Sequence, residues 1–209
     1  MKQNLFVYGC SFTDGVGCRE GHQYHDVYKT DGDLMWTEII AEKTNSNLFN
    51  YGQGLFSNDN ILDSIASSFD LIKSGDIVII EKTFHQRFNI PDLDDKRLIT
   101  YNIHPERLLN DFYPVSDGKK YTKFEKEAIT YVALLMDSDL LTNRYNLRVE
   151  FLEKVFERIG VKCIVWELEP IWSNFETIHK LTNGVMDDHH WSYKGHKDFA
   201  DYLMKKYYE

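Results

Sequence analysis

Two small nucleophiles stand together near the start of the chain. Cys10 and Ser11 follow the short apolar run "NLFVYG" at residues 4–9, and a turn rich in Gly and Asp comes next. A serine hydroxyl becomes a strong nucleophile when a neighbouring base takes its proton, whereas a cysteine reacts as its thiolate. Strand alternation places the two side chains on different sides, and a small buried Cys is the commoner outcome. Ser11 is therefore the candidate nucleophile, the alternative being a serine that only caps a turn.

A candidate base lies near the other end, in the stretch "MDDHHWSYKGH" at residues 186–196. His190 would take the proton of the nucleophile, and Asp187, three residues earlier, would orient the imidazole and stabilise the imidazolium. His189 is a second choice in another register, and His196 is expected to pack on the last helix. A metal site remains the alternative, with His189 joined by four residues of the loop after Ser11: His22, His25, Asp26 and Asp31.

Apolar runs and helical patterns alternate along the chain, and together they position these groups. Strands are predicted at 4–9, 46–52, 76–81 and 161–167. Helices are predicted at 33–44, from Ser57 or Asn58 to Gly75, at 138–159 and at about 192–207 with Ser192 as N-cap. The core-facing residues of the third helix are expected at every fourth position, namely Leu147, Phe151, Val155 and Ile159.

The alternation predicts an α/β fold: one domain over residues 1–209, in three α/β/α layers around a parallel central sheet. Ligands bind such sheets at the carboxyl ends of the strands, where Ser11 lies. Residues 88–136 break the rhythm with prolines, charges and aromatics. They are predicted to be an insertion within the domain, either a surface excursion or a lid over the site.

Composition excludes several classes of function. The net charge of −9 disfavours nucleic acid or an anionic membrane as a partner. The three cysteines form no CxxC pair and are too sparse for a disulfide framework, so neither disulfides nor a cysteine zinc site is expected. The start "MKQNLFVYG" does not read as a signal peptide, which predicts a cytoplasmic protein, with carriage on a phage or virion particle as an alternative.

Four stretches of the chain resemble the SGNH (GDSL-like) hydrolase family. "VYGCSFTDG" is similar to its first block, and "WTEIIAEKTNSNLFNYGQGLFSND" is similar to the run from the first helix into its second block. "DIVIIEKTFHQR" stands where the third block is expected, and "DDHHWSYKGH" resembles the last block, D-x-x-H followed by a small polar residue and Gly. The resemblance covers nearly the whole chain apart from the insertion, and it implies a flavodoxin-like α/β/α fold.

The resemblance also implies a function. The catalytic triad would be Ser11, His190 and Asp187, and the activity would be metal-independent hydrolysis of an ester through an acyl-enzyme. The oxyanion would be bound by the N–H of Ser11 and by an N–H of the Gly-rich turn, expected to be that of Gly54, with Gly52 and Leu55 as alternatives. Thr83, or alternatively Arg87, would be a further donor. Arg87 and Trp191 are candidate substrate contacts. The alternatives are a surface ion pair for Arg87 and core packing, the commoner role, for Trp191. The expected substrate is a small-molecule or glycan ester, such as an O-acetyl group on a carbohydrate.

Two departures from the family pattern keep another function open. Cys10 stands where the family usually has Asp, and the oxyanion-binding Asn of the third block has no clear counterpart. Losing one oxyanion donor typically lowers the rate about 10²–10³-fold. The alternative is therefore a catalytically degraded module that binds carbohydrate or has a structural role.

Overall fold

A computed structural model of the chain describes residues 2–15, 34–54, 56–84, 87–92, 97–102, 138–175 and 190–208. Its central sheet has four parallel strands, β1 (Asn4–Tyr8), β2 (Asn47–Asn50), β3 (Ile77–Lys82) and β6 (Lys162–Glu167), in the order β2-β1-β3-β6. Counted along the chain this is the order 2-1-3-4 of flavodoxin-like sheets. The prediction of an α/β fold with a parallel sheet is confirmed.

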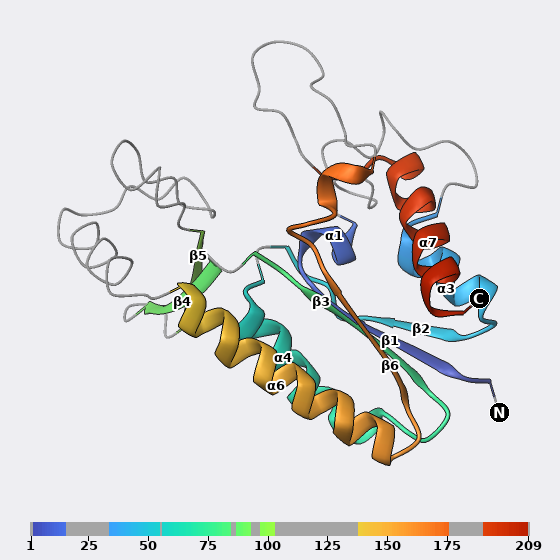
Figure 1. Ribbon diagram of the computed structural model, residues 1–209, viewed down its shortest axis with the longest axis horizontal. Coiled ribbons are helices and arrows are strands. Elements are labelled where there is room, and N and C mark those ends of the chain that lie inside the picture. Colours follow the sequence, from blue (N-terminus) through green and yellow to red (C-terminus); the bar gives the residue numbers. More distant parts are fainter. Residues whose placement is uncertain are drawn as a thin grey trace, which may run out of the picture.

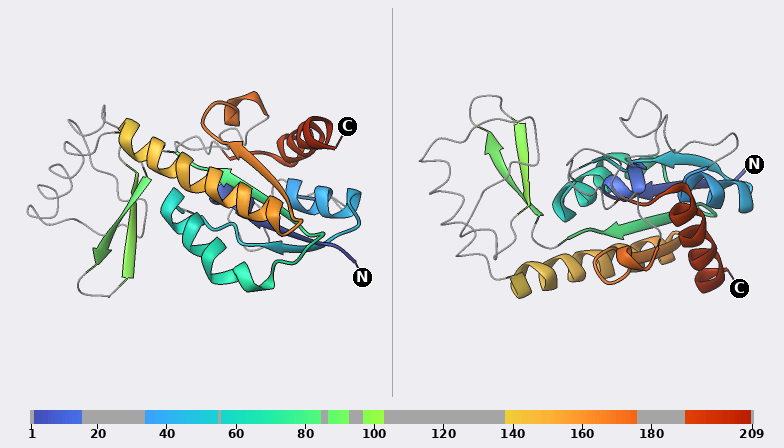
Figure 2. Two further views of the ribbon diagram at one scale, coloured as in Figure 1. Left: turned by 60° about the horizontal axis from the view of Figure 1, so that its bottom comes forward. Right: turned by 90° about the horizontal axis from the view of Figure 1, so that it is seen from above.

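Helices cover both faces of the sheet (Figures 1 and 2). The short α1 (Ser11–Asp14) follows β1, and the others are α3 (Trp36–Lys43), α4 (Asn58–Ser68), α6 (Ser138–Arg158) and α7 (Tyr193–Tyr207), with 3-10 turns η1 (Phe69–Leu71) and η3 (Trp172–Asn174). Helices α3 and α7 pack on one face and α4 and α6 on the other. Within the described ranges, no helix is long and apolar enough to cross a membrane.

The two faces follow from strand alternation. In β3, Ile77 and Ile79 point to the core under α3 and α7, while Val78 and Ile80 point to the core under α4 and α6. All four are buried, as expected for a strand covered on both sides. The same alternation directs the next residue, Glu81, to the α3–α7 side and Lys82 to the other.

Local signals in the sequence placed most helix ends correctly. The Ser57 hydroxyl accepts the Asn60 N–H at 3.3 Å, and the Ser192 hydroxyl accepts the Gly195 N–H at 3.1 Å, so both serines are N-caps. The prediction that Gly75 ends the second helix was wrong. That helix ends at Ser68 and continues only as the η1 turn, while Gly75, at φ +90°, shapes the turn into β3.

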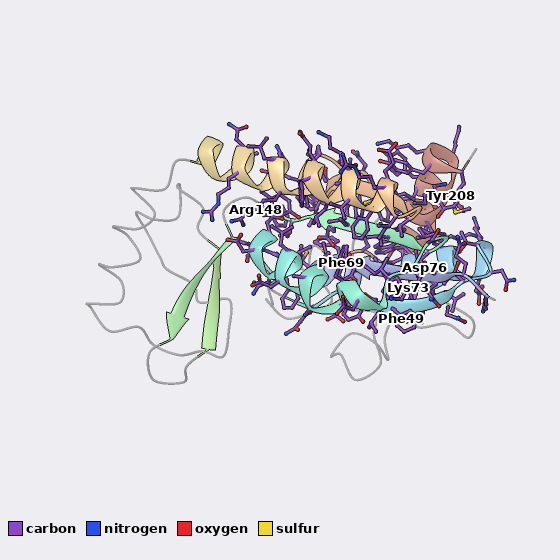
Figure 3. All side chains as sticks on the ribbon, turned by 90° about the horizontal axis from the view of Figure 1, so that it is seen from below. Phe49, Phe69, Lys73, Asp76, Arg148 and Tyr208 are labelled. Atoms are coloured by element: carbon purple, nitrogen blue, oxygen red, sulfur yellow. The ribbon has the colours of Figure 1, made fainter. Side chains whose placement is uncertain are left out.

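The predicted core face of α6 was also wrong. Leu147 and Phe151 are exposed by 67% and 66%, and among the α6 side chains described from residue 142 onward the buried ones are Tyr145, Val149 and Phe156. The exposed pair lines an open groove against α4 that also includes Leu62 and Phe69. Figure 3 shows Phe69 among the side chains between these helices. Arg148, in the middle of α6, pairs with Asp59 of α4 at 2.8 Å.

Part of the predicted insertion forms a β-hairpin. Strands β4 (Arg87–Asp92) and β5 (Arg97–Asn102) pair antiparallel in a separate two-stranded sheet, and neither strand was among those predicted. Figures 1 and 2 show the hairpin apart from the central sheet, beyond the amino end of α6. Residues 103–137 lie outside the described residues, and the role of the insertion as a lid stays a prediction.

Candidate active site

Ser11 lies on a short helical turn directly after the first strand. The chain leaves β1 at Tyr8, and Cys10 is the N-cap of α1, so Ser11 is the first helical residue. The Cys10 carbonyl accepts the N–H groups of Thr13 and Asp14 at 3.1 and 2.9 Å, which closes the turn. At this first position a backbone N–H has no intrahelical acceptor, so the serine carries both a hydroxyl and an N–H suited to a ligand oxygen. Its side chain is 4% exposed.

The neighbouring strand β2 contributes a second loop that fastens this turn. The Asn50 side chain donates to the Thr13 carbonyl at 2.9 Å, and the Gln53 N–H donates to the Gly9 carbonyl at 3.2 Å. Gly52 passes so close that a Cβ there would lie 2.5 Å from the Asp14 backbone nitrogen. Gly52, in the Gly-rich stretch after β2, therefore lies where that stretch contacts the backbone of α1, and a side chain would not fit there.

Gly54, the predicted second oxyanion donor, has a protein partner. Its N–H donates to the Asp14 carboxylate at 3.3 Å. A substrate oxygen that used this N–H would have to replace that long contact. The role of Gly54 in the oxyanion hole thus stays a prediction. It requires the Gly54 N–H to leave the Asp14 carboxylate and bind the substrate oxygen instead.

Cys10 is a hydrogen-bond donor rather than a competing nucleophile. It is fully buried, and its thiol donates to Glu81 Oε1 at 2.7 Å. Burial, followed by the nearby Glu81 charge, raises the pKa of Cys10 to about 11. The reactive thiolate is therefore scarce at neutral pH, and the expectation of a small buried cysteine is met.

Thr83 follows β3 and sits in a tight polar cluster with Asn58 and Arg87. Its N–H donates to Asn58 Oδ1 at 2.9 Å, and its hydroxyl accepts the Arg87 guanidinium at 3.1 Å. The same guanidinium donates to the Phe56 carbonyl at 3.2 Å and stacks on the Phe84 ring with its carbon 5.1 Å from the ring centre. Arg87 Nε is buried and has no hydrogen-bond partner in the described part of the chain.

His190 packs against α1, the helical turn that carries Ser11. Its ring centre lies 4.9 Å from that of Phe12, the residue after Ser11. The fold thus places His190 against the residue next to Ser11, although 179 positions separate Ser11 and His190 in the sequence, and their roles as nucleophile and base stay predictions. Asp187, Asp188 and His189 lie outside the described residues.

Trp191 and His196 are both core residues. Trp191 is fully buried, and its indole N–H donates to the Trp172 carbonyl at 2.8 Å, as expected for a packing tryptophan. His196 is 1% exposed, and within the described residues neither of its ring nitrogens has a hydrogen-bond partner. Burial, with a smaller effect of His190, lowers the pKa of His196 to about 3, so this ring is neutral.

Sequence reasoning missed Glu81. This residue lies at the carboxyl end of β3, is fully buried, and accepts hydrogen bonds from both Cys10 and Thr13. Burial raises its pKa above the ordinary 4.5. The available signal was a lone acidic residue closing the apolar run "DIVIIE". No group of three or more potential metal ligands occurs within the described ranges, so Glu81 belongs to none there. The histidines of the loop after Ser11 lie outside those ranges.

Comparisons with known proteins give a limited result. No family model matches the chain, and no curated protein matches it. One similar solved structure is the crystal structure of a member of the lipolytic protein G-D-S-L family from Veillonella parvula DSM 2008. It is 13% identical, with a TM-score of 0.37 over 98% of this chain and 97% of that one. An identity and a TM-score this low do not assign a family or an activity to this chain.

Proposed function

We propose that the chain is a metal-independent serine esterase of the SGNH type. The observation that carries the proposal is the meeting of the Ser11 turn and His190 at the carboxyl end of a parallel sheet, with 4.9 Å between the Phe12 and His190 rings. A small nucleophile on a tight turn with a histidine beside it is the arrangement that acyl transfer needs. The sequence blocks around these residues resemble that family in the same order.

In the proposed reaction, the Ser11 hydroxyl attacks the acyl carbon and its proton passes to His190. The tetrahedral intermediate collapses when the alcohol leaves with that proton, and an acyl-enzyme remains. Water then repeats the sequence and releases the acid. Asp187 would orient His190, while the Ser11 N–H, the Gly54 N–H and the Thr83 hydroxyl would stabilise the oxyanion.

Arg87 supports a polar substrate. Its guanidinium lies against Thr83 and carries a buried Nε without a partner in the described residues, so it suits a carboxylate, carbonyl or sugar oxygen. We therefore propose a small polar ester, with an O-acetyl group on a carbohydrate as the example. A contribution of Trp191 to substrate binding would come from packing, because its ring is buried.

Two observations favour a second candidate, a carbohydrate-binding or structural module without catalysis. The N–H groups of Gly54 and Thr83 both donate to protein acceptors, which leaves fewer backbone donors for an oxyanion. Such a module would bind acetylated glycans without releasing acetate.

Hydrolysis of p-nitrophenyl acetate separates these functions. The wild type, Ser11→Ala and His190→Ala are compared across the histidine pH range, with and without EDTA. The proposal expects activity that rises with pH, is lost in both variants and is unaffected by EDTA. Loss of activity with EDTA and recovery with zinc would support a metal-dependent hydrolase instead. Equal inertness of all three proteins, together with binding of acetylated glycans, would support the binding module.

A further inference from the structure

A carboxyl group is buried directly beneath the Ser11 turn. Glu81 Oε2 accepts the Cys10 N–H at 3.1 Å and the Thr13 hydroxyl at 2.5 Å, and Oε1 accepts the Cys10 thiol at 2.7 Å. Both donor residues flank the predicted nucleophile in the sequence. One side chain from the neighbouring strand thus binds the turn both before and after Ser11.

The fit around this carboxyl group leaves no spare room. A Cβ at Gly9 would lie 2.2 Å from Glu81 Oε2 and 2.1 Å from Thr13 Oγ1. The strand therefore needs glycine at that position for the carboxyl group to reach the turn. From the opposite side, Asn50 of β2 binds the Thr13 carbonyl at 2.9 Å. The turn is fixed by one side chain from each strand that flanks β1.

A structural core would not need an acid here. Ile77 and Ile79 precede Glu81 on the same face of β3, and both are buried in the same apolar core. A fully buried carboxyl group is costly, and replacing buried charges by apolar residues is often neutral or stabilising. Glu81 stands where a third isoleucine would suit the core, and its carboxyl oxygens accept hydrogen bonds from Cys10 and Thr13 of the Ser11 turn. These contacts, rather than core packing, explain an acid at this position.

We propose that Glu81 is the positioning residue of the nucleophile: by binding the Cys10 N–H and thiol and the Thr13 hydroxyl, its carboxylate fixes the direction of the Ser11 hydroxyl and N–H. This inference rests on the proposed esterase function. Glu81 does not touch the substrate and acts through Cys10 and Thr13. A small displacement of a reacting group lowers an enzymatic rate by up to about 10²-fold, so the effect falls on kcat.

Protonation of Glu81 gives the inference a pH signature. An ionised carboxylate accepts all three donors, whereas a carboxylic acid must donate its own proton, so the Thr13 hydroxyl or the Cys10 thiol has to turn from donor to acceptor. The groups that face it are the Cys10 thiol, the Arg87 guanidinium of β4 and the Tyr145 hydroxyl of α6. Burial raises the pKa of Glu81, so protonation of this carboxylate disturbs the turn on the acid side of the pH profile, and Glu81→Gln, which does not titrate, lacks that contribution.

The test measures p-nitrophenyl acetate hydrolysis against pH for the wild type, Glu81→Gln, Thr13→Val and Thr13→Ser. Glu157→Gln, an exposed glutamate on α6, is the matched control. We expect Glu81→Gln and Thr13→Val to lower kcat about tenfold to hundredfold with KM within about twofold of the wild-type value. We expect Thr13→Ser, which keeps the hydroxyl, to restore most of kcat. The acid limb of Glu81→Gln should differ in shape from that of the wild type, because glutamine does not titrate.

Each other outcome has a definite meaning. If the wild type is active and Glu81→Gln matches Glu157→Gln in kcat and in its acid limb, the inference is overturned and the proposed function stands. If Glu81→Gln does not fold, equal kcat values for Thr13→Val and Thr13→Ser overturn the inference in the same way. If the wild type itself neither cleaves the ester nor reacts at Ser11 with a phosphonate, the proposed function fails first, and the positioning role fails with it.

Discussion

Asn58 and Thr83 are joined by two hydrogen bonds. The Asn58 side-chain amide donates to the Thr83 carbonyl at 3.2 Å, and the Thr83 N–H donates to Asn58 Oδ1 at 2.9 Å. Both residues are buried, and they connect the first residue of α4 to the loop after β3. A carboxamide presents an N–H donor and a carbonyl acceptor side by side, so it satisfies both backbone polar groups of a single residue. The position of Thr83 in the proposed oxyanion site depends on this pair.

Asn58→Ala should destabilise the protein because it leaves the N–H and the carbonyl of Thr83 buried without partners. Urea unfolding should show a loss of about 1–3 kcal/mol. Asn143→Ala, at an exposed position of α6, is the control and should change the free energy of unfolding by less than about 0.5 kcal/mol. Equal losses in the two variants would contradict the role of the pair.

Gly9→Ala should damage both stability and activity. The added methyl group would meet Thr13 and Glu81 at 2.1 and 2.2 Å, so the nucleophile turn must move. We expect a loss of about 1–3 kcal/mol in thermal or urea unfolding together with a fall in ester hydrolysis. Gly75→Ala is the comparison: nothing lies within 4 Å of its Cβ, and only its φ of +90° is unfavourable. Gly75→Ala should lose some stability and keep its activity, and a fully active Gly9→Ala would refute the tight fit.

Two phenylalanines on α6 test which face of that helix is buried. Phe156 is fully buried and Phe151 is 66% exposed. Phe156→Ala should cost about 3–5 kcal/mol of unfolding free energy, and Phe151→Ala less than about 1 kcal/mol. Chemical denaturation of the two variants gives the comparison directly. The reverse ranking would mean that the face predicted from the sequence is the correct one.

Helix α6 also shows why the sequence predicts the helices and strands but not always the face that each of them buries. Strand β3 and the N-cap Ser192 were predictable because short-range periodicity and capping set them. Helix α6 carries two apolar rows, one through Leu147 and Phe151 and one through Val149 and Phe156, and only the position of the sheet decides between them. The regular spacing of the first row favoured the wrong choice.

The candidate site also has a part that local sequence motifs predict and a part that only long-range contacts define. Ser11 and His190 were predicted from local motifs, and the fold places His190 against Phe12, the residue after Ser11, while their catalytic roles stay predictions. The contact between Glu81 and Cys10 spans 71 positions, and no local pattern around Glu81 names its partner. The hairpin of β4 and β5 was not predicted because its strands contain a proline and several charged residues instead of a continuous apolar run. These strands pair with each other and not with the central sheet.

His196 predicts an acid-sensitive fold. Its folded-state pKa of about 3 lies below the ordinary 6.5, so the unfolded chain binds the proton more readily. The stabilisation is fully present above pH 6.5 and is lost as the pH falls from 6.5 toward 3. Unfolding free energies of the wild type and His196→Phe, measured across this window, should converge or cross because the variant lacks this dependence. Parallel curves would contradict a buried neutral histidine.

The most direct test of the central claim is the site of covalent reaction. The protein is treated with a fluorophosphonate at neutral pH, digested, and analysed by mass spectrometry, with Ser11→Ala and Cys10→Ala treated alongside. We predict one adduct on Ser11 in the wild type and in Cys10→Ala, and none in Ser11→Ala. No adduct in the wild type, or an adduct on another residue, would contradict the assignment of Ser11 as the nucleophile.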